Sequence, residues 1–377
     1  MANVYPLNHN RLSWIDYNRG ISIILICYFH LSYLLYQYYH IDADSYWILK
    51  YSGIFLYGFR MPLFFLISGI FLQKALAKKG LQYYINNRFN TIFYPLLIWG
   101  VIKITLQLAA GHLSPKHGGA GLYFDLLLDP RKTAPFWYLH ALFCISVLYA
   151  IVKVKFKLSP LHNFALGLVL YLISDYVTTN GVQIGFPADI FKYYVFFSVG
   201  DLITGVILSG KATGFFYSGK FFFLFLASFI LVQSVATKYN TANHDLYYVE
   251  NKLPVLYLLQ GLAGCAFSIY FSFLLQKWNA LPVLKTIGSN SLYIYCMHYI
   301  VIIASCIFCI KILHLHNTLL LIGICWFAAV ALPILFYKLS MKLNLWWLFS
   351  LNRPKDSAVF AEMHKKSPPV VSESLSA

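Results

Sequence analysis

Charged side chains are scarce in this sequence. Only 11% of its 377 residues are Asp, Glu, Lys or Arg, whereas 59% are hydrophobic and 19% are aromatic. A soluble globular domain carries about 25% charged residues, so this deficit excludes an ordinary soluble fold. The long apolar runs that accompany it indicate a polytopic membrane protein, an all-α bundle of about ten transmembrane helices. We expect these spans near 14–36, 48–73, 84–108, 134–152, 161–179, 187–208, 219–237, 252–276, 287–311 and 317–341.

Several chemical signatures are also absent. The chain has no H-E-x-x-H, no G-x-S-x-G and no Walker loop, which excludes the commonest metalloprotease, hydrolase and nucleotide-binding patterns. Its seven cysteines lie within apolar runs and lack the spacing of a disulfide framework or a metal site. Even Cys306 and Cys309, which form a C-x-x-C, are interpreted as small core residues. We therefore expect no metal, and no cleavable signal peptide is evident, because no A-x-A-like site precedes the first long run.

Acidic residues are few beside basic ones, 13 against 29, for a formal net charge of +16. In a membrane protein this excess is first a topology signal, because Lys and Arg gather in cytoplasmic segments. If the N-terminus is cytoplasmic, the inner segments hold most of the basic residues, including Arg11, Lys74, Lys78, Lys79, Arg88, Lys153, Lys155, Lys157, Lys211, Lys220, Lys277, Lys285, Lys338 and Lys342. Acids such as Asp42, Asp44, Asp245 and Glu250 gather outside. Both termini are therefore expected in the cytoplasm, and no nucleic-acid partner is needed to explain the charge.

This topology divides the chain into three parts. We expect a cytoplasmic N-terminal segment at 1–13, a transmembrane domain at 14–350 and a disordered cytoplasmic tail at 351–377, which is rich in Pro, Ser and Lys. We expect the outer loop at 238–251 to be solvated. The outer loop at 109–133 is the longest segment without an expected helix apart from the tail, and long loops are often functional.

The first span carries three ionisable residues, Asp16, Arg19 and His30. Such groups are costly within a membrane and point to a functional site. Arg19 and His30 are eleven positions apart, which is close to a whole number of helical turns and about 16 Å along the axis. A polar stripe is therefore expected from one membrane surface towards the middle. The alternative is a snorkelling Asp16–Arg19 pair, with His30 hydrogen-bonded inside the bundle.

The second span has Arg60 followed by Pro62 near its midpoint. Because proline opens the helical hydrogen-bond ladder, we predict a kinked helix that presents a buried cation. Ser68 and Gly69 follow near its inner end, either in a site or in close helix packing. The basic stretch 73–95 is interpreted as an inner loop leading through Arg88 into the third span. It suits an anionic donor, although positive-inside anchoring explains its lysines equally well.

Two later spans add further candidates. Trp137 and Tyr138 begin the fourth span, as a sugar-stacking platform or as part of the interfacial aromatic belt. In the ninth span Ser291, Tyr295 and His298 recur at four and three residues, which places them on one helix face. That face lines a substrate path or holds helices together through hydrogen bonds.

Four of these segments together resemble the acyltransferase-3 family. They are D-x-x-R-G with a histidine after ten further residues, F-R-M-P-L-F-F-x-x-S-G, the aromatic entry P-F-W-Y-L-H, and I-G-x-N-S-L-Y-x-Y-x-x-H. The resemblance covers roughly 11–350, and it implies a bacterial inner-membrane enzyme that O-acylates surface polysaccharides or their lipid-linked precursors. Asn90 and Thr91 stand where family members often have a second arginine after Arg88, so a paired-arginine clamp is not expected.

The resemblance and the chemistry of acyl transfer together assign roles. Transfer to a sugar hydroxyl needs a general base, a grip on the donor and an oxyanion stabiliser. We predict His30 as the base, with Asp16 as a second catalytic residue. The donor-binding residues are predicted to be Arg19, Arg60, Ser68 and Arg88, and the acceptor-binding residues Trp137, Tyr295 and His298.

The expected partners are acyl-CoA, a carbohydrate acceptor and membrane lipids. Acetyl-CoA is the expected donor substrate, and no tightly bound cofactor is expected. A transporter or flippase of a lipid-linked saccharide or small solute is the main alternative, because it would also need central charges. A polysaccharide polymerase or ligase would ordinarily need larger outer loops. Activity with labelled acetyl-CoA distinguishes the enzyme from the transporter.

Overall fold

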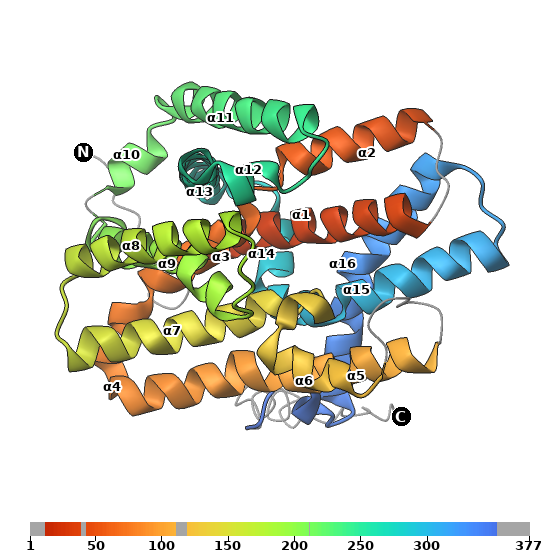
Figure 1. Cartoon of the computed structure of the whole chain (residues 1–377), viewed down its shortest axis with the longest axis horizontal. Helices are drawn as coiled ribbons and strands as arrows, with labels where there is room; N and C mark the ends of the chain where they lie inside the picture. Colours follow the sequence, from red (N-terminus) through yellow and green to blue (C-terminus); the bar gives the residue numbers. More distant parts are fainter. Residues whose placement is uncertain (1–11, 39–42, 111–118, 211, 353–377) are drawn as a thin grey trace, which may run out of the picture.

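The computed structural model describes residues 12–38, 43–110, 119–210 and 212–352, and in these ranges the protein is an all-helical bundle (Figure 1). Ten segments of the described chain are long and apolar enough to cross a membrane, which confirms the predicted all-α polytopic fold. The α-helices in chain order are α1 (Ser13–Tyr38), α2 (Ala43–Phe55), α3 (Arg60–Ile70), α4 (Leu72–Arg88), α5 (Tyr94–Ala109), α6 (Gly121–Leu128), α7 (Trp137–Lys155), α8 (Pro160–Thr179), α9 (Pro187–Leu208), α10 (Thr213–Tyr217), α11 (Phe222–Ala242), α12 (Tyr248–Lys252), α13 (Pro254–Trp278), α14 (Pro282–Ser289), α15 (Ser291–Ile307) and α16 (Thr318–Lys342).

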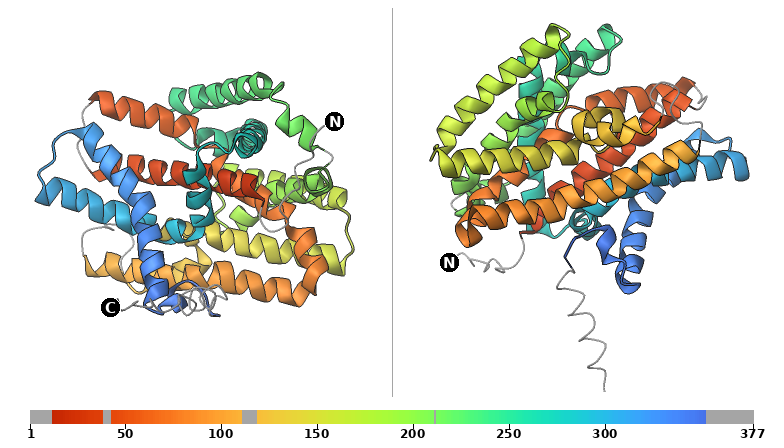
Figure 2. Two further views of the ribbon diagram at one scale, coloured as in Figure 1. Left: turned by 180° about the vertical axis from the view of Figure 1, so that it is seen from behind. Right: turned by 60° about the horizontal axis from the view of Figure 1, so that its bottom comes forward.

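Helix α1 runs through the middle of the bundle and packs against α3, α13, α14 and α15 (Figure 1). Seen from behind, α15 and α16 lie at one edge, and α16 runs obliquely to α1 (Figure 2). The start of α1 meets α14 at a very close crossing. A Cβ on Gly288 would lie 1.7 Å from the Asp16 carbonyl oxygen, and one on Gly20 would lie 2.3 Å from the Leu284 oxygen. Only glycine allows the two backbones to approach this closely, and the contact fixes the position of the first turns of α1.

The second span is broken where the sequence predicted a kink. Helix α2 ends at Phe55 and α3 begins at Arg60, with a turn between them. Pro62 has no N–H group to donate to the carbonyl of Gly58, so a regular helix cannot continue through the turn. The Arg60 side chain is buried, with 3% of its surface exposed. The predicted kinked span with a buried cation is confirmed.

Two segments interpreted as loops are helical. The basic stretch after the second span forms α4, which is interrupted only at Gly80, where φ is +75°; its Leu, Lys, Gln and Ala residues are good helix formers. A π-helical turn, Phe89–Phe93, joins it to α5. The second half of the 109–133 loop contains α6, and two leucines of this helix, Leu122 and Leu126, are buried. The stretch 111–118, with His112 and His117, lies outside the described residues, as do 1–11 and the tail from 353.

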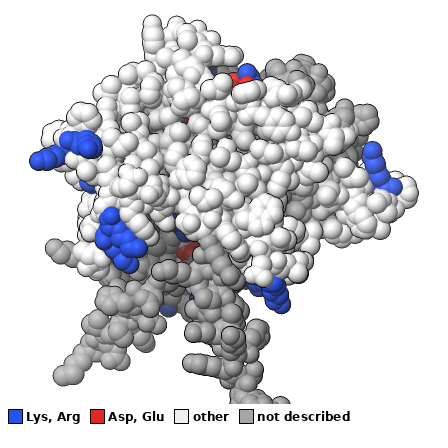
Figure 3. Space-filling model, turned by 90° about the horizontal axis from the view of Figure 1, so that it is seen from below, with Lys and Arg blue, Asp and Glu red and all other residues white. Residues whose placement is uncertain are grey.

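Polar contacts hold together the segments that were expected on the inner side of the membrane. The Trp14 backbone N–H donates to Gln276 Oε1 at 2.7 Å, which joins the start of α1 to the end of α13. Asp201 of α9 accepts from Gln73 at 3.0 Å and pairs with Lys153 of α7. The face in Figure 3 is mostly uncharged surface, with Lys and Arg side chains in a few places near its margins and a small acidic area at its upper edge. That distribution suits a bundle surrounded by lipid.

Candidate functional site

A cavity of about 240 Å³ lies beside the first half of α1, and we call it the arginine cavity. Its lining brings together Arg19 of α1, Ser68 of α3, Arg88 of α4 and Tyr295 of α15. Three of the four residues predicted to bind the donor therefore share one cavity. They come from three helices, α1, α3 and α4, and the two guanidinium groups lie on α1 and α4.

The rest of the polar lining consists of hydroxyl groups. Thr91, Tyr138 and Ser291 lie around the same cavity, and Tyr295 donates its hydroxyl proton to the Pro135 carbonyl oxygen. Two guanidinium groups are among the described lining residues, and none of those residues is Asp or Glu. The cavity is therefore suited to an anion, and guanidinium groups bind phosphate oxygens with matched geometry.

Asn90, which replaces a second arginine of the family pattern, has a structural role here. Its Oδ1 accepts the Leu351 backbone N–H at 2.6 Å and the Asn352 N–H at 3.2 Å. Asn90 therefore anchors the segment that follows α16 to the start of the third span. Thr91 lines the arginine cavity but carries no charge.

Two histidines lie side by side deeper in the bundle. The rings of His30 on α1 and His298 on α15 have centroids 5.1 Å apart. His298 Nδ1 lies 2.8 Å from the Tyr295 carbonyl oxygen and 3.2 Å from that of Ile294. Carbonyl oxygens only accept hydrogen bonds, so Nδ1 carries the proton and Nε2 has a free lone pair.

The Nε2 atom of His298 is a rare kind of group. It is buried without a hydrogen-bond partner among the described residues, and none of the His298 surface is exposed. Buried polar atoms are nearly always paired, and an exception calls for an explanation. A nitrogen with a free lone pair beside a second imidazole can accept a proton, which is a chemical role rather than a structural one.

Aromatic rings connect the histidine pair to the arginine cavity. The Tyr295 ring, which lines the cavity, lies 5.5 Å from the His298 ring and 5.2 Å from that of Tyr138. Arg19 and His30 both turn towards α15, Arg19 into the cavity and His30 against His298. The polar stripe expected along one face of α1 is therefore present.

Arg60 lies outside the arginine cavity. Its Nη1 donates to the Leu25 carbonyl oxygen at 3.1 Å and its Nε to that of Tyr57 at 3.2 Å. The guanidinium also stands 4.2 Å from the centre of the Phe29 ring, a cation–π contact. Arg60 therefore lies beside the part of α1 that precedes His30. It does not line the cavity that contains Arg19, although both arginines were predicted to bind the donor.

Two other predicted residues also lie apart from the histidine pair. Asp16 is fourteen residues before His30, about 21 Å along the helix axis, so it cannot orient the imidazole directly. Trp137 packs against the Arg131 guanidinium at 4.4 Å and the Tyr193 ring at 5.5 Å. It lines neither the arginine cavity nor the second pocket described below.

A buried ion network was missed by the sequence analysis. Glu250 is only 4% exposed, which corrects the expectation that its loop is solvated. It accepts from Tyr57 at 2.5 Å and lies 3.2 Å from Lys192 Nζ and 3.5 Å from Arg131, which also binds Asp189 at 2.6 Å. Burial alone would raise the pKa of Glu250, but the two cations and the tyrosine outweigh it and lower the pKa to about 2.

The sequence contained one signal of this ion network. Asp189 and Lys192 lie three residues apart near the end of a span, which places an acidic and a basic side chain on one helix face.

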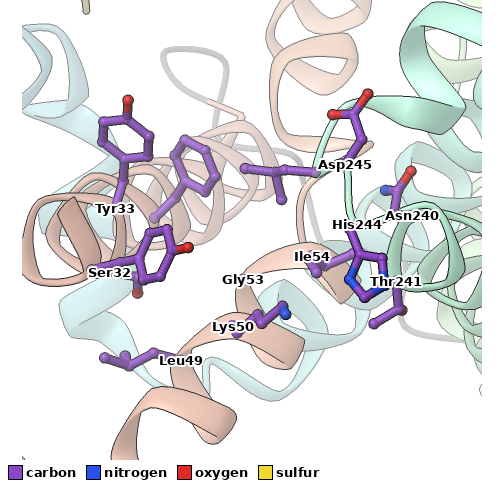
Figure 4. Close-up of a pocket in the computed structure, with 13 residues that line it drawn as sticks. Ser32, Tyr33, Leu49, Lys50, Gly53, Ile54, Asn240, Thr241, His244 and Asp245 are labelled. Carbon is purple, nitrogen blue, oxygen red and sulfur yellow. The ribbon is translucent and has the colours of Figure 1, made fainter. Parts of the chain in front are cut away.

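A second pocket, of about 170 Å³, is shown in Figure 4, and three of its four α1 residues, Ser32, Tyr33 and Tyr36, follow His30 in the chain. We call it the tyrosine pocket, after Tyr33 and Tyr36 of α1. It is also lined by Phe29 of α1, by Lys50 and Gly53 of α2, by Asn240 and Thr241 of α11, and by His244 and Asp245 after α11. The sequence analysis did not foresee it, because its walls come from three segments far apart in the chain. Across the described residues, no group of three or more His, Cys, Asp or Glu side chains is placed to hold a metal ion.

Comparison with known proteins gives a consistent result over most of the chain. The family model described as an acyltransferase domain, Acyl_transf_3, matches residues 12–338. The chain is 25% identical over 307 residues to nodulation protein NolL of Mesorhizobium japonicum, covering 76% of this chain and 75% of that protein. It is 30% identical over 148 residues to NolL of Sinorhizobium fredii, covering 38% and 37%. No solved structure matches the chain.

Proposed function

Since this chain belongs to the acyltransferase-3 family, we propose that it is a membrane O-acyltransferase that moves an acetyl or other short acyl group from acyl-CoA to a saccharide hydroxyl. The observation that carries the proposal is the order of sites along α1. A cavity with two arginines comes first, the histidine pair follows, and the tyrosine pocket lies beyond it. This order suits a donor and an acceptor that meet at the histidines from opposite ends.

The arginine cavity is the proposed donor site. Arg19 and Arg88 would bind phosphate oxygens of acyl-CoA, and Ser68 would add a hydroxyl hydrogen bond. Arg19 is about 16 Å along the axis from His30, so an extended donor arm would carry the thioester towards the histidines. Because the positive-inside rule places the start of α1 in the cytoplasm, the cavity would face the compartment that holds acyl-CoA.

His30 is the proposed general base. It would take the proton of the acceptor hydroxyl as that oxygen attacks the thioester carbonyl carbon. The C–S bond then breaks, the thiolate of CoA leaves, and the proton passes from the His30 imidazolium to the thiolate. The products are an acyl ester and CoA with a free thiol, so atoms and charge balance.

Two neighbours would assist this base. His298 Nε2, with its free lone pair, would accept a hydrogen bond from His30 and so stabilise the His30 imidazolium until its proton passes to the thiolate. The Arg60 guanidinium lies 4.2 Å from the centre of the Phe29 ring, beside His30 in the chain, and would place positive charge near the oxyanion of the tetrahedral intermediate.

The proposed setting is a bacterial inner membrane with both termini in the cytoplasm. The acceptor would be a cell-surface polysaccharide or its lipid-linked precursor, reached from the outer side. A transporter or flippase of such a saccharide is the second candidate, because openings at both ends of one helix also suit a substrate that crosses.

A single reaction separates these candidates. Purified protein in lipid nanodiscs is incubated with isotope-labelled acetyl-CoA and a set of defined oligosaccharides, and the products are analysed by mass spectrometry. The acyltransferase proposal predicts labelled acetyl esters on a saccharide together with free CoA. Saccharide movement across proteoliposomes without any acetyl ester would instead support the transporter.

A further inference from the structure

The tyrosine pocket lies near the histidine pair, with Phe29 as the link between them. Phe29 forms part of the pocket wall, and its ring lies 5.5 Å from the His30 ring. The Tyr33 ring stacks on Phe29 at 6.4 Å. Tyr33 and Tyr36 follow His30 by three and six residues, about 4.5 and 9 Å along the helix axis. A molecule in this pocket would therefore be separated from the proposed base by a single side chain, that of Phe29.

The two sides of the pocket differ in chemistry. The α1 side offers the aromatic rings of Phe29, Tyr33 and Tyr36. The facing side, drawn in Figure 4, combines polar groups with the apolar Leu49 and Ile54. Its polar residues are Lys50, Asn240, Thr241, His244 and Asp245, of which Asn240 and Thr241 also bond to nearby backbone groups. A sugar ring has C–H faces that pack on aromatic rings and hydroxyl edges that need donors and acceptors. An acyl chain would offer no hydrogen bonds to these polar groups.

Charge and size point to the same class of ligand. The described lining of the tyrosine pocket has one cation and one carboxylate, Lys50 and Asp245, whereas that of the arginine cavity has two guanidinium groups and no carboxylate. The charge of the arginine cavity therefore suits a polyanion, and the balanced charge of the tyrosine pocket suits a neutral polyol. The volume of about 170 Å³ exceeds several times the roughly 30 Å³ that one water occupies, which leaves room for a sugar ring.

We infer that the tyrosine pocket is the acceptor subsite and binds one sugar ring of the saccharide, with a hydroxyl directed past Phe29 to His30. The inference rests on the proposed acyltransferase function and assigns its acceptor to a place. The aromatic rings of α1 hold the face of the sugar, and the groups of α2 and of the α11–α12 region hold its hydroxyls.

Gly53 allows the pocket to be filled without disturbing the fold. It lines the pocket on α2, yet a Cβ added there would meet no atom within 4 Å. A leucine at this position would extend into the empty space. Leucine also favours a helix over glycine by about 0.8 kcal/mol, so Gly53→Leu should fold normally. The matched control is Gly323→Leu on α16, where an added Cβ also meets nothing and which lines neither cavity.

The test measures saccharide binding separately from catalysis. The probes are p-nitrophenyl glycosides of hexoses, deoxyhexoses and N-acetylhexosamines, bound to protein in nanodiscs and followed by saturation-transfer NMR. The best probe should bind wild type and Gly323→Leu equally, and its Kd should rise at least tenfold in Gly53→Leu and in Tyr36→Ala. Acetyl-CoA affinity should be unchanged in all three variants.

Two results would overturn the inference: no glycoside of the series binds the wild type, or the best one binds Gly53→Leu as tightly as the control. The proposed function is judged separately, by transfer. Glycoside binding that is lost in Gly53→Leu, with no acetyl ester formed by the wild type from acetyl-CoA, would uphold the pocket and reject the acyltransferase.

Discussion

At the scale of single residues, the site depends on groups that a membrane helix would otherwise avoid. His298 is held through Nδ1 by backbone carbonyl oxygens and keeps a buried Nε2 with no partner among the described residues. Arg19 and Arg88, both half-buried, face a common cavity in a bundle where charged groups are costly. Groups that are unfavourable inside a membrane protein are retained when they have a chemical role, and the role of each residue can be tested separately.

Arg19→Ala should weaken acetyl-CoA binding. Loss of a charged hydrogen bond costs about 1.5–3 kcal/mol, which corresponds to a roughly 10- to 100-fold rise in Kd. Isothermal titration calorimetry on the folded variant measures it. Lys79→Ala is the control. It removes an exposed cation from α4, the helix that carries Arg88, but Lys79 does not line the arginine cavity, so the Kd for acetyl-CoA should change little. Equal Kd values for Arg19→Ala and wild type would return Arg19 to a purely structural role.

Glu250→Gln should destabilise the fold by about 3 kcal/mol, because buried Lys192 loses its carboxylate partner. Thermal unfolding in detergent measures the change. Asp125→Asn is the control, since its pairing with Lys132 at 3.7 Å is near the surface and should contribute less than about 1 kcal/mol. If both variants unfold at the same temperature, the buried network adds nothing to stability.

The same residue gives a pH dependence with a defined sign. The pKa of Glu250 is lowered from its ordinary 4.5 to about 2 in the folded protein. Its contribution is therefore fully present above pH 4.5 and is lost as the pH falls from 4.5 towards 2. The melting temperature of wild type should drop across this window, and that of Glu250→Gln should drop less. Parallel curves would contradict the assignment.

Sequence reasoning succeeded with residues related by helix periodicity and failed with residues related by packing between helices. Arg19 and His30 share a face because of their spacing, so they were placed correctly. Arg60 was grouped with them, yet its donors are satisfied by carbonyl groups of α1 and of the turn before α3. The spacing of residues in the sequence shows which face of a helix they share, but it does not show which helices are neighbours. The tyrosine pocket was missed for the same reason.

At the scale of helices, the close packing that positions the site depends on small residues. An added Cβ on Gly69 of α3 would lie 2.0 Å from the Phe197 carbonyl oxygen of α9, and one on Gly200 would lie 2.0 Å from that of Leu66. These reciprocal contacts seat α3, and with it Ser68, against α9. Close packing was one of the two interpretations of Ser68 and Gly69, and the structure gives it to Gly69 while Ser68 lines the cavity.

Gly69→Ala should therefore lower the melting temperature, because overpacking costs about 1–3 kcal/mol. Gly205→Ala on α9 is the matched control, since an added Cβ there meets nothing within 4 Å. That substitution should be neutral or raise stability by up to about 1 kcal/mol through helix propensity. Differential scanning fluorimetry compares the two. A Gly69→Ala protein as stable as the control would mean that the α3–α9 crossing relaxes easily.

The spans themselves were predictable, because apolar length is set by the thickness of the membrane. Helices outside the apolar runs were not. α4 carries lysines and glutamines, and α6 has only eight residues, so neither gives a hydropathy signal. Their helical structure depends on local propensity and on packing against α7 and α5.

At the scale of the whole molecule, the account requires the two cavities to face opposite sides of the membrane. Single cysteines introduced at the exposed positions Lys78 and Ala242 report this. The native cysteines are buried except for the half-buried Cys144, which is replaced by alanine. In intact cells a membrane-impermeant maleimide should label Ala242→Cys and leave Lys78→Cys unlabelled until the cells are opened. The reverse pattern would overturn the donor route.

The central claim is that His30 takes part in the chemistry and is not needed for folding. Glutamine retains hydrogen bonding but cannot accept a proton near neutral pH, and general bases contribute about 10²–10⁴-fold to rates. The direct test compares wild type and His30→Gln in one preparation for melting temperature, acetyl-CoA affinity and acetyl transfer, with His298→Gln measured in parallel. The account predicts unchanged stability and donor affinity for His30→Gln, with transfer reduced at least about a hundredfold. Transfer at the parental rate would contradict it, and if His298→Gln were also fully active, the transporter would become the better explanation.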